Sequence, residues 1–530
     1  MNELRPRTAQ AGGVECRTIA DPERIRRAYA QYLQDESRMT AEGVEALHFP
    51  TSAEEAAAAV RAARRAGHRL AVSGGRTGIT GAAVPLGAEE ILSLEALKDT
   101  PVVRRNDAGG WVARVAAGTT LEELDDALTH GLYTYPDGKP EEPLFYPVDA
   151  TEMTAQLGGT IATDASGART FHYGPTRRRV EWLKVVTPDG RILELRRGEV
   201  QAEDGRLIYA RQDGEQVTLD IPDLPMPDTK HTAGYYLNPD MDALDLFFGS
   251  EGTLGIIVEA ELRLALRPAD RLFLTQFLPG PYAAIGLVNR LTGESPLEPL
   301  ALEYLGPRAL GLLRGIGRQT PAYMEVARLP SDAEAAVYME VPFENEAELD
   351  AIYAEIVALL NAEVLEPERS WAGFTEKDLQ EMKRLRHAVP EAVNAIIGQR
   401  KAEVPELHKV GTDMAVPPEA LAEMMDIYDS RLSDEGLEYA TFGHIGDGHV
   451  HVNILPSTAG ELARAEQIYA DFAGEAVRLG GTVAAEHGIG RIKKQFLPIQ
   501  YSADHINAMR AIRRAIDPDA TLNPGVLFDV

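Results

Sequence analysis

The sequence predicts a protein that mixes helices with strands and folds into about three structural units. Its 530 residues exceed the ~100–200 residues of a usual domain. Helices with recognisable N-terminal caps alternate with short apolar strands, and one pair of strands is joined by the turn residues Pro188, Asp189 and Gly190. A hydrophobic content of 44% with 25% charged residues is typical of globular proteins, so the chain can bury a core.

The individual elements can be predicted in chain order. Residues 21–46 read as a charged, helical lead-in. Four further helices begin where a capping residue is followed three places later by glutamate, at Ser52, Thr120, Asn345 and Thr458. Gly67 and Gly131 are suited to end the first two of these helices. Strands are expected at 68–73, 182–187, 191–195 and 256–266, and a polar insert at 196–227.

Charge and hydropathy restrict where the protein acts. The net charge of −29 at pH 7 and the pI near 4.9 argue against non-specific binding to nucleic acid or to an anionic membrane. Residues 1–18 contain no apolar run of the kind that a signal peptide needs. No segment approaches the ~18 consecutive apolar residues of a membrane-spanning helix. We therefore expect a cytoplasmic protein, either free or held at the inner face of a membrane by a partner.

Cys16 is the only cysteine of the chain. A disulfide within the chain is excluded, and so is an iron–sulfur cluster, which needs about four thiolates. If the protein moves electrons, it must use an organic cofactor and pass the electrons to another molecule.

Residues 74–85 form a glycine-rich loop directly after the strand expected at 68–73. Gly75, Gly78 and Gly81 follow the spacing G-x-x-G-x-x-G, and the main-chain N–H groups of such a loop can face an anion without obstruction by side chains. The loop matches neither a Walker A motif nor the G-x-G-x-x-G motif of dinucleotide-binding proteins. It is either a pyrophosphate-binding loop or a plain tight loop, and the small residues at 156–167 fit a flat ligand or tight packing.

The strongest chemical signal lies in residues 441–453. This segment contains three histidines, an aspartate and three glycines. His449, His451 and Asn453 alternate with apolar residues, which predicts a half-buried strand with its polar side chains on one face. The turn expected at 446–448 lets the chain double back and brings His444 near His451.

A second segment supplies an acid and a base side by side, Glu486 and His487, in a glycine-flanked loop. A catalytic metal site needs about three protein ligands and one open position. His444, His451 and Glu486 are the ligands we expect, for Zn²⁺, Mn²⁺ or Fe²⁺. The alternative is that the histidines are ordinary hydrogen-bonded residues of a strand and a turn.

Four segments resemble the FAD contacts of the vanillyl-alcohol-oxidase-type flavoproteins, also called the p-cresol methylhydroxylase type. They are residues 73–85, 158–167, 249–255 and 523–527. Within that superfamily, residues 443–451 and 486–490 resemble the branch of D-lactate dehydrogenases, D-2-hydroxyglutarate dehydrogenases and the flavin subunit of glycolate oxidase. The resemblance extends over about residues 47–528 and rests on motifs that occur in the same order.

The resemblance implies an α+β fold. After an N-terminal lead-in at 1–41, residues 42–268 would form an FAD-binding domain of two subdomains. Residues 269–456 would form a cap with an antiparallel sheet over the flavin. A C-terminal helical segment, 457–530, would return to the FAD-binding domain.

The resemblance also implies a set of FAD contacts. These are Ser73, Gly74, Gly75, Arg76, Thr77, Gly78, Thr80, Gly81, Pro147, Asp149, Gly158, Gly159, Ile161, Ala162, Thr163, Gly167, Glu251, Gly255, Ile256 and Asn523. The branch usually has Arg where Ser73 stands, Gly where Arg76 stands and Asn where His449 stands. His449 could add a ligand, bind the substrate or do neither. Residues 73–85 contain no His or Cys, so a flavin attached through that loop is excluded and non-covalent FAD is expected.

The implied reaction is the oxidation of a D-2-hydroxy acid, most simply D-lactate, with D-2-hydroxyglutarate or glycolate as the other candidates. A bound metal lowers the pKa of a coordinated hydroxyl, and His487 is the expected base. Arg386 matches the branch's carboxylate-binding arginine, while Lys409 and Asn453 match further substrate contacts.

Electrons would pass to an external acceptor such as a cytochrome, a quinone, an electron-transfer flavoprotein or an iron–sulfur subunit, and a homodimer is conceivable. Two other classes stay open: a flavin oxidase of a sugar or other alcohol that uses O₂, and a metal-dependent hydrolase or binding protein without flavin.

Overall fold

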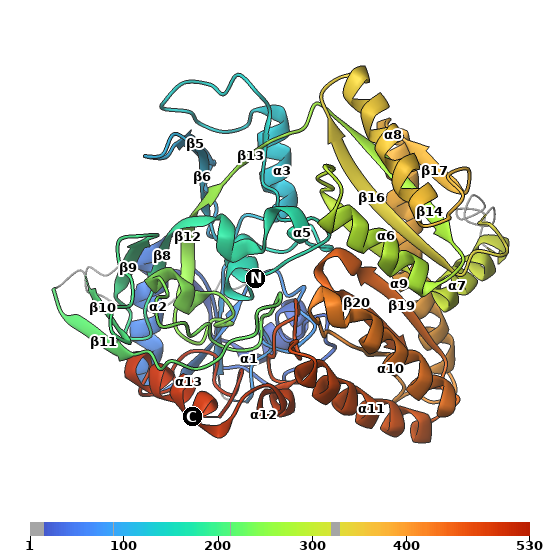
Figure 1. The fold of residues 1–530 in the computed structure, drawn as a ribbon. Helices are drawn as coiled ribbons and strands as arrows, with labels where there is room; N and C mark the ends of the chain where they lie inside the picture. The colour runs from blue at the N-terminus through green and yellow to red at the C-terminus, as the bar shows by residue number, and fades with distance from the viewer. Residues whose placement is uncertain (1–14, 88, 212–213, 320–328, 530) are drawn as a thin grey trace, which may run out of the picture.

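The computed structural model describes residues 15–87, 89–211, 214–319 and 329–529. Helices and strands are mixed throughout, and the expected α+β class is confirmed. Figure 1 shows the seven-stranded sheet and its helices on the right, and the smaller sheets to the left and centre. Among the described residues, no helix combines the length and the apolar character needed to cross a bilayer.

The first sheet has four strands in the order β1-β2-β4-β3. They are β1 (Arg17–Ile19), β2 (Leu47–Phe49), β3 (Arg69–Ser73) and β4 (Glu89–Ser93). β2 and β3 run parallel to β4, whereas β1 is antiparallel to β2. The helix α2 (Ala53–Ala66) links β2 to β3, with Ser52 as its N-cap and Gly67 in the left-handed conformation at its end, as the sequence predicted.

The second sheet has five antiparallel strands in the order β5-β6-β12-β8-β9. They are β5 (Val102–Arg105), β6 (Trp111–Ala116), β8 (Val180–Val186), β9 (Ile192–Arg196) and β12 (Ile256–Arg263). Helices α3 (Leu121–His130), α4 (Leu157–Ala162) and α5 (Thr170–Tyr173) lie in the connection from β6 to β8, with the short strand β7 (Leu144–Phe145) paired to β13 (Ala265–Leu266). The capping box at Thr120 and the left-handed Gly131 are both present in α3.

The third sheet has seven antiparallel strands in the order β17-β14-β16-β15-β19-β20-β18. They are β14 (Asp270–Leu278), β15 (Ala301–Leu305), β16 (Ala335–Phe343), β17 (Ser370–Gly373), β18 (Val410–Gly411), β19 (Tyr439–His444) and β20 (His449–Ile454). The short 3₁₀ turn η7 (Ile445–Asp447) joins β19 to β20. Helices accompany this sheet: α6 (Pro281–Gly293), α7 (Pro307–Gln319), α8 (Glu346–Ala362), α9 (Glu376–Arg400) and α10 (Leu421–Asp434).

The last part of the chain is helical and returns to the first sheet. Its helices are α11 (Ala459–Arg478), α12 (Leu497–Gln500) and α13 (Ala503–Ile516), drawn in red in Figure 1. The main-chain N–H of Leu70 in β3 donates to Thr521 O at 2.8 Å, and that of Asn523 donates to Leu70 O at 2.8 Å. The end of the chain therefore lies beside the glycine-rich loop that follows β3.

Three local predictions differ from the structure: two were incomplete and one was wrong. In the lead-in, helix α1 (Pro22–Ala28) ends at Ala28 and is followed by a single turn, η1 (Ala30–Tyr32). The polar insert holds a hairpin of β10 (Arg206–Ala210) and β11 (Gln216–Asp220). β20 is buried on both faces and is not half-buried as predicted, because the seven-stranded sheet packs against other elements there.

Candidate active site

The histidines of the site lie on the hairpin of β19 and β20, where His444 stands opposite His449 in the register. The turn η7 ends at Gly448, whose φ is 64°. A Cβ at this position would lie 2.0 Å from the main-chain oxygen of Val416, so only glycine fits the turn. The predicted reversal of the chain is confirmed, since the rings of His444 and His451 have centroids 5.7 Å apart.

Two of the imidazoles are oriented by partners behind them. Nδ1 of His444 lies 2.5 Å from Oε1 of Glu303, and Nδ1 of His451 lies 3.0 Å from the main-chain oxygen of Thr412. Because both partners only accept hydrogen bonds, each Nδ1 carries the proton and donates it. The Nε2 atoms face the carboxylate of Glu486, at 3.1 Å from His444 and 3.8 Å from His451. Metal-binding histidines are typically oriented in this way, with the nitrogen that faces away from the metal donating to an acceptor.

Burial and neighbouring charges affect the two rings differently. Burial lowers the pKa of His451 to about 4, so this imidazole is neutral at pH 7. Burial also acts to lower the pKa of His444, but Glu303 and Glu486 outweigh it and raise that pKa to about 9. At pH 7 the ring of His444 is therefore protonated, and its positive charge is paired with these two carboxylates.

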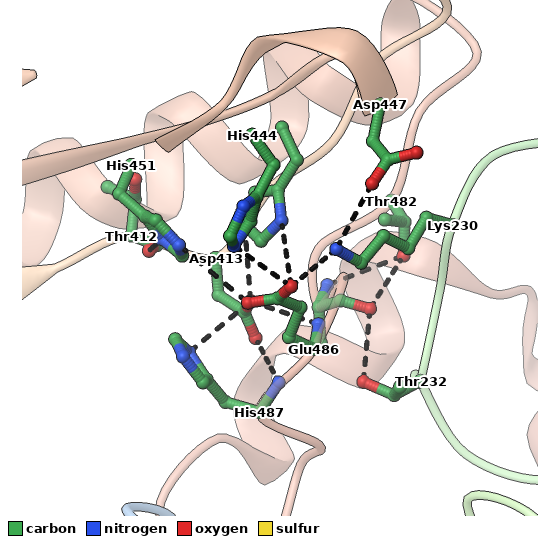
Figure 2. Close-up of polar contacts among 12 residues, drawn as sticks. Lys230, Thr232, Thr412, Asp413, His444, Asp447, His451, Thr482, Glu486 and His487 are labelled. Carbon is green, nitrogen blue, oxygen red and sulfur yellow. Dashed lines mark hydrogen bonds and ion pairs between the residues drawn. The ribbon is translucent and has the colours of Figure 1, made fainter. Parts of the chain in front are cut away.

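Glu486 lies at the centre of the cluster. Figure 2 shows contacts from the histidines on one side and from Lys230 on the other, all reaching its carboxylate. The ammonium group of Lys230 donates to Oε1 of Glu486 and lies 3.4 Å from Oδ2 of Asp447. Burial acts to raise the pKa of Glu486, but His444 and Lys230 outweigh it and hold that pKa well below its ordinary value of 4.5. Glu486 is therefore an ionised carboxylate.

Asp413 organises the loop that carries Glu486 and His487. Its Oδ1 accepts from the main-chain N–H of Glu486 and its Oδ2 from that of His487, both at 3.1 Å, while Nζ of Lys493 donates to Oδ2 at 2.8 Å. Nδ1 of His487 lies 3.3 Å from Oδ1 of Asp413, so Nδ1 carries the proton and Nε2 is the proton-accepting atom. The ring of His487 stacks on that of His451, with centroids 5.5 Å apart.

Sequence reasoning missed four charged residues of this network whose side chains are buried: Lys230, Glu303, Asp413 and Lys493. None of them stands in a motif. Each comes from a different part of the chain, and only the fold places it next to the cluster.

The structure brings the three predicted ligands together and adds a fourth residue. One potential ligand atom from each of His444, His449, His451 and Glu486 lies within 4.8 Å of the others. Three imidazoles and a carboxylate form a donor set that suits a divalent transition metal. The residues present thus fit the ion that the sequence predicted.

A cavity of about 380 Å³ lies beside the cluster, and its wall contains much of the predicted FAD site. The predicted residues that line it are Gly74, Gly75, Arg76, Thr77, Gly78, Thr80, Gly158, Gly159, Ala162, Thr163, Glu251, Gly255 and Asn523. Glu486 and His487 line it as well, so the cavity reaches the cluster.

The other predicted FAD residues are not part of this lining: Ser73, Gly81, Pro147, Asp149, Ile161, Gly167 and Ile256. Ser73, Ile161 and Ile256 are fully buried behind the wall. Gly167 has a packing role, because a Cβ there would lie 1.6 Å from the main-chain oxygen of Asp149.

The cavity has the features that a flavin cofactor needs. A Cβ on Gly78 or Gly159 would meet no protein atom within 4 Å, so these glycines present bare backbone to open space. Two polar atoms in its wall, Oε1 of Gln156 and Oγ of Ser166, are buried without a hydrogen-bond partner among the described residues. Unpartnered buried atoms of this kind call for a polar ligand. The residues present therefore fit FAD.

A smaller cavity of about 80 Å³ lies on the other side of His444 and His451. Its wall is mostly apolar and includes Leu305, Tyr338, Met382, Leu385, Pro390 and Phe442. Among the described side chains that line it, none is a lysine or an arginine. Residues of the cluster and its loop therefore line both cavities, and Thr151 is part of both walls.

The predicted substrate contacts lie at different distances from this small cavity. Arg386 is in α9, but its side chain lies outside the described residues. Lys409 precedes β18 and is exposed, and Asn453 is buried in β20; neither lines either cavity beside the cluster. The substrate roles of all three stay predictions.

Comparison with known proteins places these features in context. Residues 44–196 match the FAD binding domain, and residues 267–527 match the C-terminal domain of FAD linked oxidases. The D-2-hydroxyglutarate dehydrogenase of Xanthomonas citri pv. viticola is 32% identical, over 91% of this chain and 89% of that protein. The D-lactate dehydrogenase of Archaeoglobus fulgidus is 30% identical, over 90% of this chain and 89% of that protein.

Two further likenesses are more distant. The glycolate oxidase subunit GlcD of Bacillus subtilis is 29% identical, over 73% of this chain and 71% of that protein. Among solved structures, an alkyldihydroxyacetonephosphate synthase superimposes with a TM-score of 0.64 at 17% identity, covering 96% of this chain and 82% of its own. This last likeness concerns the fold alone.

Proposed function

The chain belongs to the FAD-linked oxidase family, and on this premise we propose that it is an FAD-dependent dehydrogenase that oxidises a D-2-hydroxy acid to the 2-oxo acid. The observation that carries the proposal is the place of the histidine–glutamate cluster between two cavities. Glu486 and His487 line the large cavity, and His444 and His451 line the small one. A substrate in the small cavity is thereby held next to a cofactor in the large one.

The chain's own residues supply the acid–base chemistry. The large cavity would hold FAD, which would supply an acceptor for the hydride from C2 of the substrate. His444, His451 and Glu486 would hold a divalent ion, which would lower the pKa of the substrate hydroxyl. His487 takes the hydroxyl proton at Nε2, because Asp413 fixes the proton of the ring on Nδ1.

The small cavity supports a small acid as the substrate. Its described wall offers apolar side chains, which suit the methyl group of D-lactate better than the second carboxylate of D-2-hydroxyglutarate. The substrate's carboxylate would be bound by Arg386. This assignment rests on the resemblance of residues 383–390 to the corresponding motif of the family.

The electrons leave the protein through an external acceptor. Cys16 is the only thiol of the chain, so an iron–sulfur relay would have to come from another protein. A cytochrome, a quinone, an electron-transfer flavoprotein or an iron–sulfur subunit would each serve this purpose.

Anaerobic bleaching of the protein-bound flavin tests the function without any assumption about the acceptor. The holoprotein is mixed with D- and L-lactate, D- and L-2-hydroxyglutarate and glycolate, and the rate of flavin reduction is followed. We expect rapid reduction by D-lactate and slow or no reduction by the L-enantiomers. His487→Ala should keep the flavin but reduce it far more slowly. A flavin that none of the acids reduces would refute the proposed activity.

A further inference from the structure

His449 is the buried residue of the cluster that the proposed reaction does not use. Its side chain is fully buried, and neither ring nitrogen has a hydrogen-bond partner among the described residues. An imidazole that loses its hydrogen bonds on burial destabilises the fold. Such a residue calls for a partner that the polypeptide itself does not provide.

His449 shares one feature with the other two imidazoles: one of its ring nitrogens faces Glu486. Nδ1 of His449 lies 3.9 Å from Oε1 of Glu486, and its Nε2 lies 3.6 Å from Oδ1 of Asp413, beyond hydrogen-bond distance. The nitrogen that faces away from Glu486 donates to Glu303 in His444 and to the main-chain oxygen of Thr412 in His451. Ligating histidines use this arrangement to fix their tautomer.

We propose that His449 is a fourth protein ligand of the metal ion, through Nδ1, the ring nitrogen that faces Glu486. This inference rests on the proposed function only in that it shares the same metal site. The group of His444, His449, His451 and Glu486 would then hold the ion with three imidazoles and one carboxylate.

Four protein ligands restrict which ion can work at this site. An ion in tetrahedral coordination would have no position left for a substrate oxygen, although a catalytic site needs one. An ion that accepts five or six ligands keeps positions for the hydroxyl and carboxylate oxygens of a 2-hydroxy acid. The site therefore favours Mn²⁺, Fe²⁺ or Co²⁺ over tetrahedral Zn²⁺.

Pulsed EPR of the Cu²⁺-substituted holoprotein tests the ligand directly, because it counts coordinated imidazoles. We expect three imidazoles in the wild type and two in His449→Asn. The matched control is His505→Asn, which removes another buried histidine with an unpartnered nitrogen, on α13 and outside the cluster. That variant should retain three. A count of two in the wild type would overturn the proposal without any variant, so the test does not depend on the folding of His449→Asn.

Titration of the chelated, FAD-loaded protein with Co²⁺ gives a second readout. His449→Asn should bind Co²⁺ more than ~100-fold more weakly, since loss of an outer-shell partner alone costs about 10–100-fold. The wild-type complex should show the weak visible absorption of a five- or six-coordinate ion. Unchanged affinity in His449→Asn would refute the ligand role even if D-lactate still bleaches the flavin. Conversely, a confirmed ligand role with no flavin reduction would refute the proposed function alone.

Discussion

Replacement of Asp413 by alanine tests how the cluster is held in place. The Asp413 carboxylate is fully buried, accepts hydrogen bonds from the main-chain N–H groups of Glu486 and His487, and pairs with Nζ of Lys493 at 2.8 Å. Lys493 is itself buried, so Asp413→Ala leaves an ammonium group without its counter-charge. Breaking a buried pair in this way costs about 3–5 kcal/mol of the free energy of unfolding.

A double variant separates the charge from the hydrogen bonds. In Asp413→Ala/Lys493→Met the unpaired ammonium is gone, so most of the lost stability should return. The N–H groups of Glu486 and His487 still lack their acceptor, and a residual deficit of about 1–2 kcal/mol should persist. The catalytic loop stays misplaced in both variants, and a displacement of this kind costs on the order of 100-fold in kcat.

Urea unfolding and flavin-reduction kinetics on the same samples measure the two effects. Asp413→Ala should be the least stable, and the double variant should lie between it and the wild type, about 1–2 kcal/mol below the wild type. The rate of flavin reduction should be low in both variants, because the loop that carries Glu486 and His487 is displaced in both. A double variant no more stable than Asp413→Ala would refute the role assigned to the ion pair. A wild-type rate in either variant would show that Asp413 does not position His487.

Three further predictions concern the cofactor, the substrate and pH. Gly78→Val should fold but lose flavin absorbance, because its Cβ points into open space that FAD would fill. The control Gly474→Val, at an exposed position of a helix, should keep the flavin absorbance. Full flavin occupancy in Gly78→Val would show that this loop does not hold the cofactor. Arg386→Ala should raise KM and weaken kcat/KM by about 1–3 kcal/mol in steady-state kinetics, and an unchanged KM for every acid tested would remove it from the site. Burial raises the pKa of the Glu251 carboxyl from 4.5 to about 7, so the folded state holds this proton up to a higher pH than the unfolded state does. The contribution to the free energy of unfolding is complete below pH 4.5 and is lost as the pH rises through 7. Relative to Glu251→Gln, the wild type should lose up to about 3 kcal/mol over this range in pH-dependent unfolding, and parallel profiles would contradict the assignment.

Local rules predicted much of the fold. The caps at Ser52, Thr120, Asn345 and Thr458 are all present, because a capping side chain satisfies N–H groups within its own first turn. The hairpin β10–β11 had a visible signal that was overlooked: Leu207, Tyr209, Val217 and Leu219 are buried and alternate with exposed residues. The prediction of a helical lead-in at residues 21–46 was only partly right, because a charged segment without a continuous apolar stripe does not sustain a long helix.

The residues of the candidate site are likewise of two kinds: those that a local motif indicates and those that only the tertiary structure brings to the site. His444, His451 and Glu486 stand in short motifs whose residue types indicate a metal, and the structure places them together. Asp413 could not be found by such reasoning, since an isolated aspartate just after a short strand carries no chemical signal. Its role follows from tertiary pairing, with partners 73 to 80 residues away in the chain.

The loop that carries Glu486 and His487 is anchored on two sides, and this explains how one segment serves both cavities. On one side Asp413, next to the seven-stranded sheet, accepts from its N–H groups. On the other side Glu251, in the wall of the large cavity, accepts from the N–H groups of Ile489 at 2.8 Å and Gly490 at 2.9 Å. The loop therefore couples the position of the proposed base to the cofactor wall and to the histidine hairpin at once. Preorganisation of this kind lets the site meet substrate and cofactor without rearranging during the reaction.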